Sequence, residues 1–248
     1  ILKPYSSARD EFKGEANTWL DANENPHNNG VNRYPDPYQK QLKGIIYKIK
    51  NVAYESIFLG NGSDEPIDLL IRAFCEPGKD KVLICTPTYG MYEVAASVNN
   101  VALIKIPLTK KFDIDESTLT PYVKDKSLKL IFLCSPNNPT GNCLSDNKII
   151  NILKNFKGIV VLDEAYVDFS SEGSFLDELH KYPNLVILQT FSKAWGMAGI
   201  RLGLAYASKQ IVDLLNKIKY PYNINILTQE FASKQLLEKN NFKEEIEK

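Results

Sequence analysis

Short apolar segments alternate with amphipathic helical segments along most of the chain. Five apolar segments have the length of buried β-strands: KVLICT (81–86), VALIKIPL (101–108), LKLIFLCSP (128–136), GIVVLDEAY (158–166) and NLVILQTFS (184–192). The apolar periodicity predicts helices over 39–50, 61–74, 90–99 and 145–156. Continuous apolar strands interleaved with helices are typical of parallel sheets covered on both faces. The sequence therefore predicts an α/β fold with a mainly parallel sheet.

The second predicted helix, over 61–74, contains its own start signals. Ser63 or Asp64 is expected to cap it, and Pro66 fits the first turn, where a missing N–H is tolerated.

The composition argues against several classes of protein. The 30 Lys and Arg residues balance the 30 Asp and Glu residues, so no basic field favours nucleic acid. The apolar segments are far shorter than the roughly 20 residues of a membrane span, and the N-terminus lacks a signal-like segment. With only two histidines, and four cysteines without CxxC spacing, no metal site is expected. We expect a cytoplasmic protein that binds neither nucleic acid nor membrane.

Polar residues follow several of the predicted strands. In open α/β sheets the ligand site lies beyond the carboxyl ends of the strands. The segments there are SPNNPTG (135–141), DEAY (163–166) and FSK (191–193), and NGSDE (61–65) opens a helix. Together they offer amide, carboxylate, phenol, amine and backbone N–H groups. This set suits a cofactor that has a phosphate, an aldehyde and a ring nitrogen.

A series of motifs in fixed order carries a family resemblance. They are LDANENP, NRYPDP, GNGSDE, PTYGMY, SPNNPTG, DEAY and SKAWGMAGIRLG, from residue 20 to residue 203. Together they resemble the pyridoxal 5′-phosphate (PLP) dependent aminotransferases of fold type I, and within them the histidinol-phosphate aminotransferases. The resemblance implies a three-layer α/β/α large domain, with most of the C-terminal small domain missing from this chain.

The resemblance assigns chemical roles to residues at the strand ends. It implies that Lys193 binds the PLP aldehyde covalently and then moves a proton; a lysine amine suits this role when desolvation or nearby positive charge keeps it neutral. Asp163 would pair with the pyridine nitrogen and keep the ring electron-withdrawing. Tyr166 and Asn138 would hydrogen-bond the 3-oxygen of PLP. From the residues alone, a solvated loop lysine, a helix cap and an Asx-turn are the alternatives for Lys193, Asp163 and Asn138.

The cofactor phosphate would bind at a helix start. The resemblance assigns it the backbone amides of Ser63 and Asp64, where the helix dipole favours an anion. Ser192 and a bidentate Arg201 would complete the site. In the family, Tyr34 reaches the phosphate from the neighbouring subunit, whereas a tyrosine beside two prolines could equally be structural.

Three further residues are assigned to the ring and the substrate. Tyr89 would stack on the pyridine ring, with simple packing as the alternative. Tyr5 would approach the substrate phosphate, and Asn23 would line the pocket. All three assignments come from the resemblance.

The resemblance also implies domains, substrates and assembly. Residues 1–30 would close over the active site, 31–220 would form the PLP-binding large domain, and 221–248 would begin the helix that leads to the small domain. The expected reaction transfers an amino group between histidinol phosphate or imidazole acetol phosphate and 2-oxoglutarate or glutamate, in a homodimer with shared active sites. Threonine-phosphate decarboxylase, aromatic aminotransferase and a non-catalytic PLP-binding fragment are the alternatives. The arginine for the substrate carboxylate would lie beyond Lys248.

Overall fold

Seven strands form one sheet in the computed structural model, which describes residue 3, residues 8–238 and residue 246. The strands are β1 (Ile57–Asn61), β2 (Lys81–Thr86), β3 (Ala102–Pro107), β4 (Leu128–Cys134), β5 (Ile159–Asp163), β6 (Leu185–Thr190) and β7 (Leu202–Ala207). Their order is β1-β7-β6-β5-β4-β2-β3. The neighbours from β3 to β6 pair in parallel, whereas β7 is antiparallel to both β6 and β1. The prediction of a mainly parallel sheet is confirmed.

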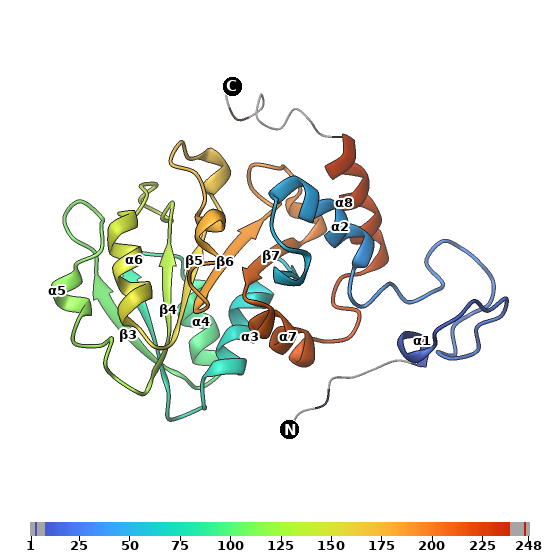
Figure 1. The fold of residues 1–248 in the computed structure, drawn as a ribbon, viewed down its shortest axis with the longest axis horizontal. Helices are drawn as coiled ribbons and strands as arrows, with labels where there is room; N and C mark the ends of the chain where they lie inside the picture. The colour runs from blue at the N-terminus through green and yellow to red at the C-terminus, as the bar shows by residue number, and fades with distance from the viewer. Residues whose placement is uncertain (1–2, 4–7, 239–245, 247–248) are drawn as a thin grey trace.

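Helices cover both faces of this sheet (Figure 1). The α-helices are α1 (Ala8–Glu11), α2 (Lys40–Lys50), α3 (Asp64–Phe74), α4 (Met91–Val98), α5 (Glu116–Leu119), α6 (Asp146–Asn155), α7 (Lys209–Ile218) and α8 (Ile226–Glu238). Short 3-10 turns are η1 (Tyr54–Ser56), η2 (Val167–Phe169), η3 (Phe175–Glu178) and η4 (Ala198–Ile200). Helices α2, α6 and α8 pack on one face, and α3, α4 and α7 on the other. The chain therefore has the three layers of an α/β/α sandwich.

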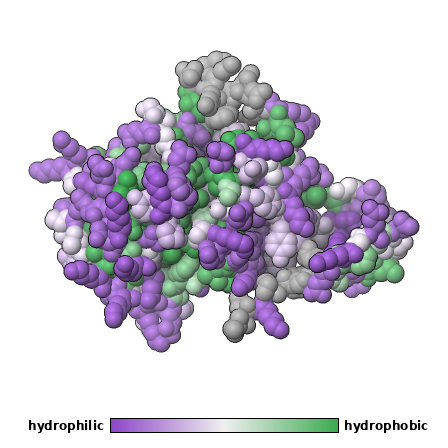
Figure 2. Space-filling model, in the orientation of Figure 1, coloured by the Kyte–Doolittle hydropathy of each residue, from purple (hydrophilic) through white to green (hydrophobic). Residues whose placement is uncertain are grey.

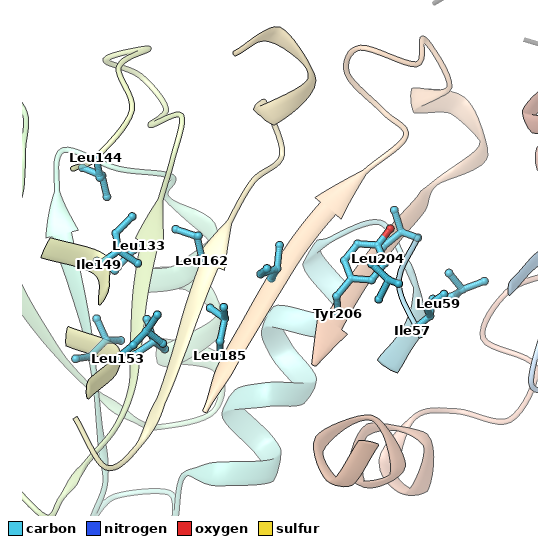
Figure 3. Packing of buried hydrophobic residues seen from close by; sticks show 14 of the residues in the cluster. Ile57, Leu59, Leu133, Leu144, Ile149, Leu153, Leu162, Leu185, Leu204 and Tyr206 are labelled. Carbon is cyan, nitrogen blue, oxygen red and sulfur yellow. The ribbon is translucent and has the colours of Figure 1, made fainter. Parts of the chain in front are cut away.

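The core divides into two apolar clusters because strand side chains alternate between the faces. On the face shown in Figure 3, Leu133 and Leu162 pack with Ile149 of α6. Their strand neighbours Phe132 and Val161 belong to the opposite cluster. Each fully buried leucine or isoleucine contributes about 1.5–3 kcal/mol relative to an exposed one, so both clusters stabilise the sheet.

The five apolar segments correspond to β2–β6, and the four helical segments to α2, α3, α4 and α6. Strands β1 and β7 were not expected. The first is only five residues long, and the second, LGLAYA, contains glycine and alanine in place of β-branched residues. They pair with each other, so tertiary context specifies both.

The expected N-cap position of α3 is confirmed at Ser63, but the expected side-chain capping bond is not formed. Ser63 occupies the N-cap position in a right-handed helical conformation, and its side chain makes no capping hydrogen bond. A side-chain cap requires a more extended backbone at this position. The Glu65 carboxylate instead reaches back and accepts a hydrogen bond from the Asn61 amide at 2.5 Å.

The surface seen in Figure 2 is mostly hydrophilic, with scattered hydrophobic side chains. Within the described residues, no helix combines the length and the apolar character that crossing a bilayer requires.

Gly203 of β7 packs directly against the turn that precedes α3. A Cβ at this position would overlap the backbone of Gly62 and Ser63. We expect Gly203→Ala to lower the free energy of unfolding by about 1–3 kcal/mol, because the backbone must shift. Gly44→Ala in α2 is the matched control: its Cβ meets nothing within 4 Å, and it should be neutral or stabilising by up to about 1 kcal/mol. Urea unfolding measures both, and equal stability of the two variants would contradict the close approach.

Candidate active site

A cavity lies where strands β4, β5 and β6 end and α3 begins. It is lined by Ser63, Asp64, Tyr89, Cys134, Asn138, Asp163, Ala165, Tyr166, Thr190, Ser192, Lys193 and Arg201. Nine of the ten residues that the sequence analysis assigned to the cofactor are therefore brought together. Three lining residues were not among those assigned: Ala165, and Cys134 and Thr190, which are the last residues of β4 and β6. For Cys134 and Thr190, their position at strand ends was the signal that could have found them.

Asp163 is the last residue of β5 and is only 2% exposed. One carboxylate oxygen accepts a hydrogen bond from the Tyr92 hydroxyl at 2.7 Å, and the other from the Ala165 amide at 3.0 Å. Burial raises the pKa of this carboxyl, although these two hydrogen bonds oppose the effect. Both hydrogen-bond donors are neutral, so a cation that contacts the carboxylate would further favour its charged form.

Tyr92, on α4, was not singled out by the sequence analysis. Its side chain is fully buried, stacks on Phe132 with ring centroids 4.9 Å apart, and meets the edge of Tyr89 at 5.6 Å. Burial first, and then the Asp163 charge, raises the pKa of Tyr92 well above its ordinary value. The phenol therefore keeps its proton and remains a donor to Asp163. Its place in PTYGMY, three residues after Tyr89, was the available signal.

Lys193 lies in the turn after β6, between two buried aromatic residues. Phe191 and Trp195 pack edge to face with ring centroids 5.2 Å apart, and the Trp195 indole donates to Asp168 at 3.0 Å. This anchors the turn on both sides of the lysine. The Lys193 amine lies 5.4 Å from the centroid of the Tyr166 ring, within the range of a cation–π contact.

A second group of residues in the cavity has the features of an anion site. Gly62 has a positive φ of 73°, and the turn it forms leads directly into α3. The first amides of a helix have no intrahelical acceptors and carry the positive end of its dipole. Arg201 approaches so closely that a Cβ on Gly62 would lie 2.6 Å from its guanidinium. Ser192 has a buried hydroxyl oxygen without a hydrogen-bond partner.

Asp64 contacts both Tyr89 and Arg201 in the cavity. Its carboxylate accepts a hydrogen bond from the Tyr89 hydroxyl at 3.0 Å and lies 3.4 Å from the Arg201 guanidinium. Burial, and then the neighbouring Asp64 charge, raises the pKa of Tyr89 to about 12. Tyr89 is therefore a neutral donor at physiological pH.

The two adjacent asparagines of SPNNPTG occupy different environments. Asn137 is 4% exposed and donates to the Pro87 carbonyl at 3.0 Å and to the Thr140 hydroxyl at 2.8 Å. It thus holds the loop in place, while Asn138 lines the cavity.

The residues present fit PLP. A buried carboxylate without a cationic hydrogen-bond donor suits a protonated ring nitrogen, and a lone buried hydroxyl beside an arginine and a helix start suits a phosphate. Lys193 supplies an amine in the same cavity.

Tyr34 and Asn23 line a different cavity, together with Tyr222. Tyr34 is 52% exposed and stacks on the Tyr222 ring at 4.5 Å. Tyr34 is thus the one assigned cofactor residue that does not line the cavity around Lys193. Tyr5 lies outside the described residues. The roles of these three residues stay predictions.

Comparisons with known proteins agree with this geometry. The family model "Aminotransferase class I and II" matches residues 9–248. A histidinol-phosphate aminotransferase of Cytophaga hutchinsonii is 60% identical over 238 residues, which cover 94% of this chain and 68% of the relative.

Solved structures have the same fold. The histidinol-phosphate aminotransferase of Clostridium acetobutylicum has a TM-score of 0.78 at 29% identity, covering 87% of this chain and 64% of that one. The enzyme of Sinorhizobium meliloti in complex with pyridoxal-5′-phosphate has a TM-score of 0.79 at 22% identity, covering 87% and 59%. The chain thus spans about two thirds of the length of these proteins. Because the family model matches nearly the whole chain, and the Cytophaga relative matches it at 60% identity, this protein belongs to the class I and II aminotransferases.

Proposed function

We propose that this chain is the PLP-binding part of a histidinol-phosphate aminotransferase, which transfers an amino group between histidinol phosphate and 2-oxoglutarate. The observation that carries the proposal is one cavity that combines a buried carboxylate, an amine and an anion site. The relatives at 52–61% identity, which bear this name, support the choice of substrate.

When bound, PLP supplies an aldehyde that links to amines and a ring that withdraws electrons from the amino-acid Cα. In the proposed complex, Lys193 holds the aldehyde and, once released, moves the proton at Cα. Asp163 holds a proton on the ring nitrogen through a charged hydrogen bond. Tyr166 and Asn138 donate to the 3-oxygen, and Tyr89 covers the ring.

The phosphate would bind at the opposite end of the cavity. The amides of Ser63 and Asp64, the Ser192 hydroxyl and the Arg201 guanidinium are its proposed donors. A charged, bidentate arginine contact is stronger than a neutral hydrogen bond, so Arg201 would contribute most to retention of the phosphate.

Tyr34 suggests a homodimer with shared sites. It is exposed and lies outside the cavity around Lys193, so in a dimer it is free to contact the cofactor phosphate of the neighbouring subunit. Asn23 and Tyr5 are proposed substrate contacts from the same N-terminal region. Histidinol phosphate is an intermediate of histidine biosynthesis, and we propose a cytoplasmic enzyme.

Lys193→Ala tests the covalent role of the lysine. After incubation with equimolar PLP and borohydride reduction, we expect the unchanged chain to gain one PLP adduct, which peptide mapping places on Lys193. The variant should gain none at that peptide. Lys181→Ala is the control, because Lys181 forms only an exposed ion pair with Glu178. An adduct in Lys193→Ala equal to that of the unchanged chain would remove Lys193 from its role.

Asp163→Asn should raise the thermal stability of the cofactor-free chain. Because burial raises the folded-state pKa above 3.8, the folded chain binds this proton more tightly than the unfolded chain. Stability therefore falls as the pH rises from 3.8 toward the folded-state value, and the loss persists above it. Asparagine carries no charge and avoids this loss. Tm at pH 8 should therefore rise by roughly 2–4 °C for each kcal/mol gained in the free energy of unfolding.

The same variant should lose much of the stabilisation by PLP, because the ring nitrogen no longer meets a carboxylate. Thermal unfolding at pH 5 and pH 8, with and without PLP, measures both effects. Asp213→Asn is the control, since this carboxylate forms an exposed pair with Lys209. A PLP-induced rise in Tm as large in Asp163→Asn as in the unchanged chain would show that Asp163 does not contact the cofactor.

The shared-site proposal predicts a dimer. Light scattering should give twice the mass of one chain, and Tyr34→Phe should weaken PLP binding without changing this mass, since only the hydroxyl is lost. A monomer that binds PLP as tightly as the dimer would rule out shared sites.

A further inference from the structure

Glu65 supports the turn that would hold the cofactor phosphate, although it does not line the cavity. One oxygen of its carboxylate accepts two hydrogen bonds: from the Asn61 amide at 2.5 Å and from the Asn223 side-chain amide at 3.0 Å. Asn61 is the last residue of β1, directly before Gly62 and the start of α3. The Glu65 carboxylate therefore connects Asn61, at the β1 end of this turn, to Asn223 in the segment after α7.

Asn223 lies in the linker between α7 and α8 and uses its whole side-chain amide. The NH₂ group donates to Glu65 and to the Leu59 carbonyl at 3.0 Å each. The oxygen accepts from Lys219 at 3.0 Å and from Gln39 at 3.4 Å. An amide with two donors and two accepting positions is fully satisfied by these four contacts. The linker is thus held in one position relative to β1 and α3.

Lys219 extends the network to the N-terminal segment. It is 8% exposed, and its ammonium group donates to the Pro37 carbonyl at 2.7 Å as well as to Asn223. The Gln39 amide donates to the same Pro37 carbonyl at 2.8 Å. Three segments that are distant in sequence, around residues 37, 61 and 223, are therefore joined by side-chain hydrogen bonds.

The opposite side of the turn is held by the backbone. The Gly62 amide donates to the Arg201 carbonyl at 2.7 Å, and Gly203 packs against Gly62 and Ser63. The turn is thus fixed by β7 on one side and by Glu65 on the other. Anion binding by backbone amides depends on their fixed direction, so both supports bear on the phosphate site.

We propose that Glu65 and Asn223 are positioning residues, which hold the turn 61–64 in the shape that receives the cofactor phosphate and couple it to the linker 219–225. The inference rests on the proposed function, since it takes PLP as the ligand. Glu65 acts through the Asn61 amide, and Asn223 acts through Glu65. Loss of either should weaken the contacts of the phosphate and leave those of the ring intact.

The test compares PLP with pyridoxal, which has the ring and aldehyde but no phosphate. We measure the affinity of both for the full chain and for Glu65→Ala, Asn223→Ala and Glu65→Gln. The two alanine variants should bind PLP about tenfold more weakly, because the turn amides lose their fixed direction, with pyridoxal affinity unchanged. Glu65→Gln keeps an accepting oxygen and should retain most of the PLP affinity.

Asn225→Ala is the matched control within the same linker. Its side chain accepts a hydrogen bond from the Thr228 amide at 2.9 Å, at the start of α8. Among the described residues, no side-chain hydrogen bond joins it to the turn. It should lower thermal stability but keep the preference for PLP over pyridoxal. If Asn223→Ala does not fold, Glu65→Ala and Glu65→Gln decide the question.

The outcomes separate the inference from the proposed function. An unchanged preference for PLP in Glu65→Ala, or an equal loss of both ligands, would overturn the positioning role. A full chain that binds PLP no better than pyridoxal would instead overturn the phosphate site and the proposed function with it.

Discussion

The buried carboxylate of Asp163 is the constraint around which the site is arranged. It ends β5, with β4 and β6 on either side, so the sheet itself excludes solvent from it. Its side-chain hydrogen bonds come from neutral donors, and its pKa is raised by burial. Burial of a carboxylate costs free energy, and a cation that contacts the carboxylate offsets this cost. The end of β5 is therefore suited to bind a positively charged group.

The apolar core reaches this carboxylate through Tyr92. The tyrosine ring stacks on Phe132 of β4, while its hydroxyl donates to Asp163. Packing of α4 on the sheet therefore fixes the direction of a hydrogen bond in the site. A substitution that moved α4 would therefore also alter the hydrogen bond from Tyr92 to the Asp163 carboxylate. The site depends in this way on the packing of the core beside it.

The antiparallel strand β7 explains how Arg201, a cation of the anion site, reaches the edge of the sheet at which Asp163 lies. Parallel strands β4, β5 and β6 all end there, and an antiparallel neighbour must begin there. Arg201 directly precedes β7 and so lies at that edge. Gly203 then allows β7 to pack against the turn before α3. The direction of β7 and the lack of a Cβ at Gly203 thus bring Arg201 to the start of α3, more than 130 residues earlier in the chain.

The sequence predicted β2–β6, because their apolar runs are continuous and need little context. It did not predict β1 and β7, which pair with each other, and β7 contains glycine and alanine in place of β-branched residues. Nine site residues could be assigned because they follow strands or open a helix, within motifs of one family.

The residues that support the site were not predictable in the same way. Tyr92 is one aromatic residue in an apolar helix, and its contact with Asp163 spans 71 positions. Glu65 looks like an ordinary first-turn acid, and Asn223 like a loop residue, because their partnership spans 158 positions. Local sequence motifs therefore indicate which residues face a ligand. The residues that support them are brought into place only by the tertiary fold.

The pair of Asp64 and Arg201 shows why the anion site is accessible to a ligand. Their side chains are 35% and 50% exposed, and the two atoms are 3.4 Å apart. An ion pair of this exposure contributes only about 0–1 kcal/mol. A phosphate carries more charge and offers two oxygens to the planar guanidinium in a bidentate arrangement. In the proposed complex, Arg201 therefore exchanges a weak partner for a stronger one, while Asp64 keeps its hydrogen bond from Tyr89 and with it the position of the ring that covers the cofactor.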